Sequence, residues 1–311
     1  MFRNFSFKKS LFSSCYSTLE NNRFFGIDFR NYLRILQKNK IYGSYKFSTI
    51  DAKQINNFDA YSSYSWFPET HDSILLKFNH LRTSFLLEHI SNKSASLNGP
   101  LSGKKILDIG SGAGIFSERL SELGGDVLGV DASYKSIDIA YKNALCNSTS
   151  FKEISKFNNE NELNNFMNSM PKPRSLRYFK GGIEHIQKSE IFDIIVASEV
   201  IEHVNNPGIF VKLISNLLKK DGIVLFTTLN RTVLCYIYSI IFGEKIFEMI
   251  PKGTHSWRKF IKPNELDGFA RKNGLYKVAK TGTIYIPGPN IFIECENMNK
   301  LNYLAIYKKD Q

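Results

Sequence analysis

The stretch K-I-L-D-I-G-S-G-A-G-I-F at residues 105–116, followed by V-L-G-V-D at residues 127–131, decides the fold. Apolar residues before Gly110 are typical of a buried strand, and glycines then alternate to Gly114, which predicts a tight turn. Such a turn tolerates positive φ and lets a ligand lie against the backbone where the next helix begins. Asp131 ends the second strand, where a carboxylate can accept both hydroxyls of a ribose. We therefore expect a βαβ unit with a nucleotide-type pocket.

The spacing of the glycines separates two classes of cofactor. A dinucleotide-binding turn reads G-x-G-x-x-G/A, whereas Ile115 stands where its last small residue would be. The chain instead reads D-x-G-x-G-x-G, with Asp108 followed by Gly110 and Gly112. This form, with Asp131 after it, resembles the first two motifs of class I S-adenosylmethionine-dependent methyltransferases. That resemblance implies S-adenosylmethionine as the cofactor; an ordinary tight turn is the alternative interpretation.

Further strands and helices alternate along the chain. Residues 191–198 and 223–228 are apolar runs typical of buried parallel strands, and a further strand is expected at residues 177–181. Residues 74–90 and 207–219 carry apolar side chains at helical spacing. This alternation predicts an α/β fold with a doubly wound, mostly parallel sheet. The class I methyltransferase resemblance implies seven strands. Ligands should bind at the carboxyl ends of the parallel strands.

Composition excludes several classes of protein. The chain has 311 residues, is 42% hydrophobic and carries a net charge of +12. Most of the excess charge lies in residues 1–50, and no Arg/Lys stripe follows, so we do not expect nucleic-acid binding. The four cysteines form no C-x-x-C pair, which argues against a zinc site or a disulfide framework. The apolar run at residues 233–242 is too short for a membrane-spanning helix, which needs ~20 residues.

Residues 1–50 are basic and serine-rich and contain almost no acids, which is typical of an organelle transit peptide. We expect import into mitochondria; a plastid address, or a basic tail of a cytosolic protein, is the alternative. Residues 51–311 should form the methyltransferase domain. Within it, the Asn-rich segment 147–175 is expected to be a surface loop without chemistry.

The segment E-V-I-E-H follows the strand expected at residues 191–198. It places Glu199, Glu202 and His203 at positions i, i+3 and i+4, which is one face if the segment is helical. Two carboxylates and an imidazole can hold a divalent cation, and oxygen ligands favour Mg²⁺. Alternatively, the histidine only lines the pocket of an enzyme that uses no metal.

Several separate blocks resemble one family, the ubiquinone-biosynthesis O-methyltransferases of bacteria and mitochondria. They include A-Y-S-S-Y-S-W-F-P-E, N-H-L-R, S-E-V-I-E-H-V, F-T-T-L-N-R and M-I-P-K-G-T-H-S-W-R-K-F-I-K-P-N-E-L. The resemblance implies cofactor contacts at Arg82, Gly110, Gly112, Asp131 and Ser198, and metal ligands at Glu199, Glu202 and His203. The chain departs from the family's usual residues at Phe67 (Trp), His80 (Pro), Ser111 (Cys) and Ser198 (Met). Ser198 can thus reach the cofactor only through its backbone or a shorter side chain.

The implied reaction is methyl transfer from S-adenosylmethionine to a phenolic oxygen of a polyprenylated catechol. A metal chelated by the two hydroxyls would lower the pKa of the phenol. No general base stands out; His203, if it is not a ligand, Lys252 and His255 are candidates. A methyltransferase for another small phenol or amine, and a non-catalytic lipid-binding subunit of a quinone-biosynthesis complex, are the alternative functions.

An apolar and basic insert at residues 231–262 fits a substrate with an isoprenoid tail. Apolar side chains beside basic ones can lie in a bilayer interface near anionic lipids. We therefore expect a peripheral protein on the matrix face of the mitochondrial inner membrane, with a multi-subunit quinone-biosynthesis complex as a candidate partner. A hydrophobic lid helix packed on the sheet is the alternative interpretation of the insert.

Overall fold

A computed structural model describes residues 48–51, 55, 74–90, 99–146, 154–157, 176–239, 256–286, 288–289, 291–295 and 300–310. Its strands are β1 (Lys105–Ile109), β2 (Asp126–Asp131), β3 (Ile154–Phe157), β4 (Leu176–Lys180), β5 (Phe192–Ser198), β6 (Leu218–Leu229), β7 (Leu275–Ile286), β8 (Ile291–Cys295) and β9 (Asn302–Lys309). Its α-helices are α4 (Ile74–Glu88), α5 (Ile115–Glu122), α6 (Tyr134–Cys146), α8 (Pro207–Leu217), α9 (Val233–Cys235) and α10 (Pro263–Lys272). Single 3₁₀ turns are η2 (Ile183–His185), η3 (Ile201–His203) and η5 (Trp257–Lys259).

Several predictions lie outside the described residues. They are the expected transit peptide up to residue 47, most of the Asn-rich segment, and the candidate bases Lys252 and His255. Residues 240–255 of the apolar insert also lie outside.

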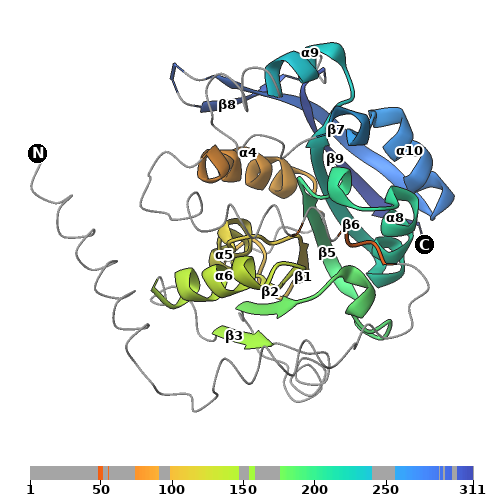
Figure 1. Cartoon of the computed structure of the whole chain (residues 1–311). Coiled ribbons are helices and arrows are strands. Elements are labelled where there is room, and N and C mark those ends of the chain that lie inside the picture. Colours follow the sequence, from red (N-terminus) through yellow and green to blue (C-terminus); the bar gives the residue numbers. More distant parts are fainter. Residues whose placement is uncertain are drawn as a thin grey trace, which may run out of the picture. The chain divides into compact units, whose positions relative to one another are not determined.

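The described strands form one sheet in the order β3-β4-β2-β1-β5-β6-β9-β7-β8 (Figure 1). In this order, all neighbours from β3 through β4, β2, β1 and β5 to β6 pair in parallel. The pairs β6–β9, β9–β7 and β7–β8 are antiparallel. This confirms the doubly wound, mostly parallel sheet. The strand count was wrong, because the described part contains nine strands, with β3 and β8 at the two edges.

Strand β3 lies inside the segment that we expected to be a loop without regular structure. Its residues 154–157 pair in parallel with residues 176–179 of β4. A neighbouring strand supplies the backbone hydrogen bonds that an isolated strand of four residues cannot make for itself. Asn-rich composition therefore failed to predict structure here, because the deciding partner is distant in sequence.

Helices cover both faces of the sheet, with α4, α5 and α6 on one face and α8 and α10 on the other (Figure 1). Successive residues of β1 show this division. Ile106 belongs to a buried cluster with Phe116 of α5, whereas Leu107 belongs to a second cluster with Phe210 of α8. Since neighbouring residues of a strand point to opposite faces, a strand buried on both faces reads as a continuous apolar run.

The glycine loop between β1 and α5 has the backbone that the sequence predicts. Gly110, Gly112 and Gly114 all have positive φ, of 70°, 53° and 82°. A Cβ atom added at Gly110 would lie 2.2 Å from Val200 Cγ2, so this position excludes a side chain on two grounds. The loop therefore needs glycine both for conformation and for space.

Replacing Gly110 by alanine should destabilise the fold more than the same change at Gly103. Gly103 also has positive φ, of 78°, but a Cβ there meets nothing within 4 Å. We expect Gly103→Ala to lower the free energy of unfolding by about 1–2 kcal/mol, the cost of left-handed backbone. Gly110→Ala adds the clash with Val200, for a total of about 3 kcal/mol or more. Urea unfolding measures both; equal losses would contradict the steric account.

Candidate cofactor and acceptor site

The carboxylate of Asp131 is fixed against the glycine loop at the carboxyl end of β2. Its Oδ2 accepts the N–H of Gly112 at 3.0 Å, and its Oδ1 accepts the N–H of Ser133 at 2.8 Å. Gly110 N–H donates to the carbonyl of Val130 at 2.7 Å, which holds the loop beside the strand end. Both carboxylate oxygens keep further lone pairs, so Asp131 can still accept hydroxyls. The structure thus brings Gly110, Gly112 and Asp131 together.

Arg82 reaches the same edge from α4 and is only 5% exposed. Its Nη1 donates to Ser198 Oγ at 2.8 Å, and its Nε donates to Asn79 Oδ1 at 2.9 Å. Its guanidinium lies 3.9 Å from the centre of the Phe116 ring. Burial lowers the pKa of Arg82 to about 10, although Asp108 and Glu199 act to raise it. Arg82 therefore stays a cation at neutral pH, beside Ser198 as the sequence predicts.

Asp108 lies beneath the loop and is buried. Its Oδ2 accepts the hydroxyl of Ser117 at 2.6 Å. Burial raises the pKa of Asp108 to about 6; the bond from Ser117 and the charge of Arg82 lower it, and Asp131 adds to the rise. The first residue of the glycine motif is therefore an acid that titrates near neutral pH.

The carboxylates after β5 do not form the helical face that the sequence predicts. Glu199 has left-handed backbone, with φ of 57°, and the turn from Ile201 to His203 is a single 3₁₀ turn. The spacing i, i+3, i+4 therefore does not describe one surface. Glu199 Oε1 instead accepts the hydroxyl of Thr227 at 2.8 Å, and Glu202 Oε2 accepts that of Thr228 at 2.8 Å.

Glu202 is 2% exposed, and its second carboxylate oxygen, Oε1, has no hydrogen-bond partner among the residues that the structure describes. Burial first, and then the charge of Glu199, raise the pKa of Glu202 well above its usual range. A proton or a cation would relieve this buried charge. Among the described residues, however, no three His, Cys, Asp or Glu side chains converge on one point. The expected trio with His203 is thus not a preformed metal centre.

Sequence reasoning missed four polar residues that bind other polar side chains, three of which are predicted site residues. Thr227 and Thr228 end the apolar β6, and Asn79 precedes Arg82 by one helical turn. Polar side chains at the carboxyl end of a buried strand were a signal that could have found the two threonines. The fourth, Thr49, donates its N–H and its hydroxyl to Glu184 at 3.2 and 2.6 Å. No local pattern predicts that bond.

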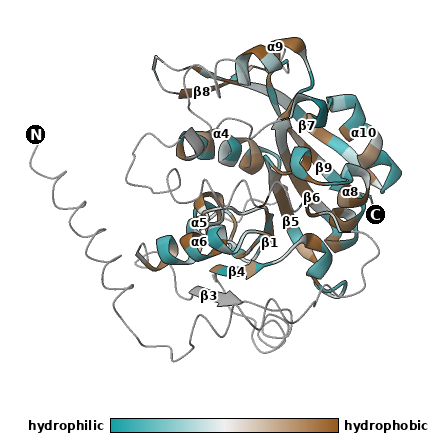
Figure 2. Ribbon diagram, in the orientation of Figure 1, coloured by the Kyte–Doolittle hydropathy of each residue, from teal (hydrophilic) through white to brown (hydrophobic). Residues whose placement is uncertain are grey.

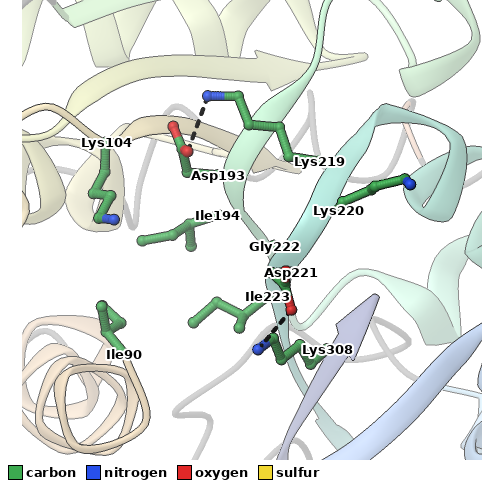
Figure 3. Close-up of a pocket in the computed structure, with 10 residues that line it drawn as sticks. All are labelled: Ile90, Lys104, Asp193, Ile194, Lys219, Lys220, Asp221, Gly222, Ile223 and Lys308. Carbon is green, nitrogen blue, oxygen red and sulfur yellow. Dashed lines mark hydrogen bonds and ion pairs between the residues drawn. The ribbon is translucent and has the colours of Figure 1, made fainter. Parts of the chain in front are cut away.

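A cavity of about 390 Å³ lies at the opposite, amino edge of the parallel strands (Figure 3). Four lysines line it, together with isoleucines and two aspartates. Lys219 pairs with Asp193 and Lys308 pairs with Asp221, both at 2.9 Å. None of the predicted site residues line this cavity, so it is not where we place the chemistry.

Comparison with known proteins agrees with this geometry. A family model described as a methyltransferase domain matches residues 78–280. The mitochondrial ubiquinone biosynthesis O-methyltransferase of Rattus norvegicus is 33% identical over 261 residues, which cover 83% of this chain and 69% of the rat protein. The ubiquinone biosynthesis O-methyltransferase of Pelagibacter ubique is 34% identical over 230 residues, which cover 73% of this chain and 85% of the bacterial protein.

The chain belongs to the ubiquinone biosynthesis O-methyltransferase family. As a member of this family it is an S-adenosylmethionine-dependent O-methyltransferase of ubiquinone biosynthesis. Among solved structures, the magnesium protoporphyrin IX methyltransferase of Synechocystis PCC 6803 with bound SAH is 12% identical, with a TM-score of 0.51. The match covers 83% of this chain and all of that protein, which confirms the fold of this ubiquinone biosynthesis O-methyltransferase family member.

Asp108→Asn should change how the stability of the enzyme depends on pH. Because the pKa of Asp108 is about 6 in the folded state and near 3.8 in the unfolded chain, the folded state binds the proton more tightly. Wild-type stability should therefore fall as pH rises from about 4 to about 6, by up to about 3 kcal/mol. The variant lacks this fall.

Urea unfolding at a series of pH values tests the point. The unfolding free energy of Asp108→Asn minus that of the wild type should increase as the pH rises to about 6 and stay constant above about pH 7. Glu122→Gln, which removes an exposed carboxylate, is the control for loss of one charge. Parallel pH profiles of stability for the wild type and Asp108→Asn would contradict the raised pKa of Asp108 in the folded state.

Proposed function

We propose that this enzyme transfers the methyl group of S-adenosylmethionine to a phenolic oxygen of a polyprenylated catechol. The observation that carries the proposal is the carboxyl edge of the sheet. There the loop at Gly110, the acid Asp131 and the buried cation Arg82 adjoin the carboxylates Glu199 and Glu202. The first group fits a cofactor with a ribose and a carboxylate, and the second fits an acceptor that must lose a proton.

On the cofactor side, each residue has a separate task. Asp131 accepts the ribose hydroxyls, and the glycine loop admits the cofactor against the backbone. A guanidinium has five N–H donors, and the bonds of Arg82 to Asn79 and Ser198 use three of them. The two remaining donors can bind the cofactor's carboxylate. Holding both ends of the cofactor fixes the position of the methyl group between them.

On the acceptor side, a phenolic oxygen attacks the methyl carbon while the carbon–sulfur bond breaks. The bonding electrons pass to sulfur, and the phenolic proton is lost. Glu199 is half-buried and Glu202 is buried, and together they place negative charge where a proton or a cation is favoured.

Mg²⁺ fits these two carboxylates. It is commonly bound by one or two carboxylates while it keeps several other oxygen ligands, so three protein ligands are not required. The partnerless Oε1 of Glu202 is the atom that supports this assignment. When bound, the cation would supply positive charge that lowers the pKa of the catechol.

Purified enzyme, S-adenosylmethionine and a short-tailed catechol precursor test the proposal. We expect methylated product with Mg²⁺, loss of turnover with EDTA, and recovery on addition of excess Mg²⁺. Glu199→Gln should lower kcat/KM about 100-fold, at the upper end of effects seen around metal ligands. Turnover that EDTA does not affect would contradict the proposed role of the metal but not the proposed reaction. Cofactor binding without turnover would indicate that the acceptor is another phenol or an amine. Absence of cofactor binding would indicate a non-catalytic subunit.

We also propose that the protein meets its substrate at the surface of the mitochondrial inner membrane. Val233 is 68% exposed and Leu234 is 47% exposed, and Tyr236 and Ile237 continue the apolar surface. Figure 2 shows hydrophobic colouring on the ribbon at α9. No helix in the described residues is long and apolar enough to cross a bilayer. Exposed apolar side chains on a short helix fit shallow insertion at the interface.

Val233→Glu/Leu234→Glu should reduce binding to vesicles of phosphatidylcholine and phosphatidylglycerol about 10- to 100-fold, because two apolar side chains lose their burial in lipid. Liposome co-sedimentation measures the effect. Ile191→Glu/Val278→Glu is the matched control, since these side chains are 43% and 42% exposed on other parts of the surface. Equal binding of both double variants would rule out this membrane contact.

A further inference from the structure

A continuous chain of hydrogen bonds links the cofactor side of the site to the acceptor side. Arg82 Nη1 donates to Ser198 Oγ at 2.8 Å, Ser198 Oγ lies 2.7 Å from Thr227 Oγ1, and Thr227 Oγ1 donates to Glu199 Oε1 at 2.8 Å. Three different elements, α4, β5 and β6, supply its first three members.

The direction of every bond in this chain follows from counting protons. Thr227 has one hydroxyl proton, and it donates that proton to Glu199, which as a carboxylate can only accept. Thr227 must therefore accept from Ser198, which donates its own single proton. The oxygen of Ser198 then accepts from Arg82, which can only donate. All bonds point the same way, from a cation to an anion.

Burial strengthens this arrangement. Thr227 is fully buried and Arg82 nearly so, and hydrogen bonds that share one direction polarise each other in such surroundings. Arg82 and Glu199 also interact electrostatically, since Glu199 acts to raise the pKa of Arg82. The neighbouring Thr228 binds Glu202 and is not part of the chain.

We propose that Ser198 and Thr227 are positioning residues that couple cofactor binding at Arg82 to the orientation of Glu199. The inference rests on the proposed function, because it takes Arg82 as the ligand of the cofactor's carboxylate. The family resemblance implies methionine at position 198, and a thioether has no proton to pass along the chain.

A double-variant cycle on the affinity for S-adenosylhomocysteine tests the coupling without metal or acceptor. Thr227→Val and Glu199→Ala each break the same chain, so each should weaken binding about 5-fold, as expected for one buried hydrogen bond. The double variant should also lose about 5-fold, not 25-fold, because the second change has nothing left to break. Thr227→Ser keeps the hydroxyl and should bind like wild type.

Thr228→Val is the control, since it removes an equivalent buried hydroxyl outside the chain. Combined with Glu199→Ala, it should multiply the individual losses. Isothermal titration calorimetry gives the affinities, and thermal unfolding checks that each variant is folded. Multiplicative losses for Thr227→Val with Glu199→Ala would overturn the coupling alone. Failure of the wild-type enzyme to bind S-adenosylhomocysteine would overturn the proposed function and the coupling with it.

Discussion

The buried guanidinium of Arg82 organises the functional edge of the sheet. A cation that loses its water must regain partners inside the protein, and Arg82 does so through Asn79, Ser198 and the ring of Phe116. These partners come from α4, α5 and β5, so the requirement of one side chain fixes three elements relative to each other. Its neighbour Asp108 is buried in the same low-dielectric surroundings, and this burial raises the pKa of Asp108. Arg82 acts to lower the pKa of Asp108, and Asp108 acts to raise the pKa of Arg82, so each charge partly offsets the effect of burial on the other.

Local sequence was sufficient for the parallel half of the fold. Strand β1, its glycine loop, α5 and β2 follow from apolar runs, glycine spacing and one acid, because each of these features acts on its own neighbours. Strands β4 and β5 were also predicted, and for β5 the reason is that burial on both faces leaves a nearly continuous apolar run. The edge strand β3 was missed because its stability comes from pairing with β4.

The site was predictable as a set of residues and less so as an arrangement. Arg82 lies beside Ser198, and Asp131 lies against the glycine loop, while their contacts with the cofactor stay a prediction. The left-handed backbone of Glu199 was not predictable from a spacing rule that assumes a helix. The roles of Thr227 and Thr228 could not be predicted, because a hydroxyl's partner depends on which strand lies beside it.

The hydrogen bonds from Thr49 to Glu184 bear on where a protease could cleave the N-terminal part of the chain. Glu184 is buried, and Thr49 donates to both of its carboxylate oxygens, while the backbone of Thr49 and Ile50 accepts hydrogen bonds from Asn205. A protease that removed residue 49 would deprive a buried carboxylate of these donors, which is a costly loss inside a protein. Cleavage after Thr49 would therefore destabilise the folded enzyme, whereas cleavage ahead of Thr49 would leave its bonds to Glu184 in place.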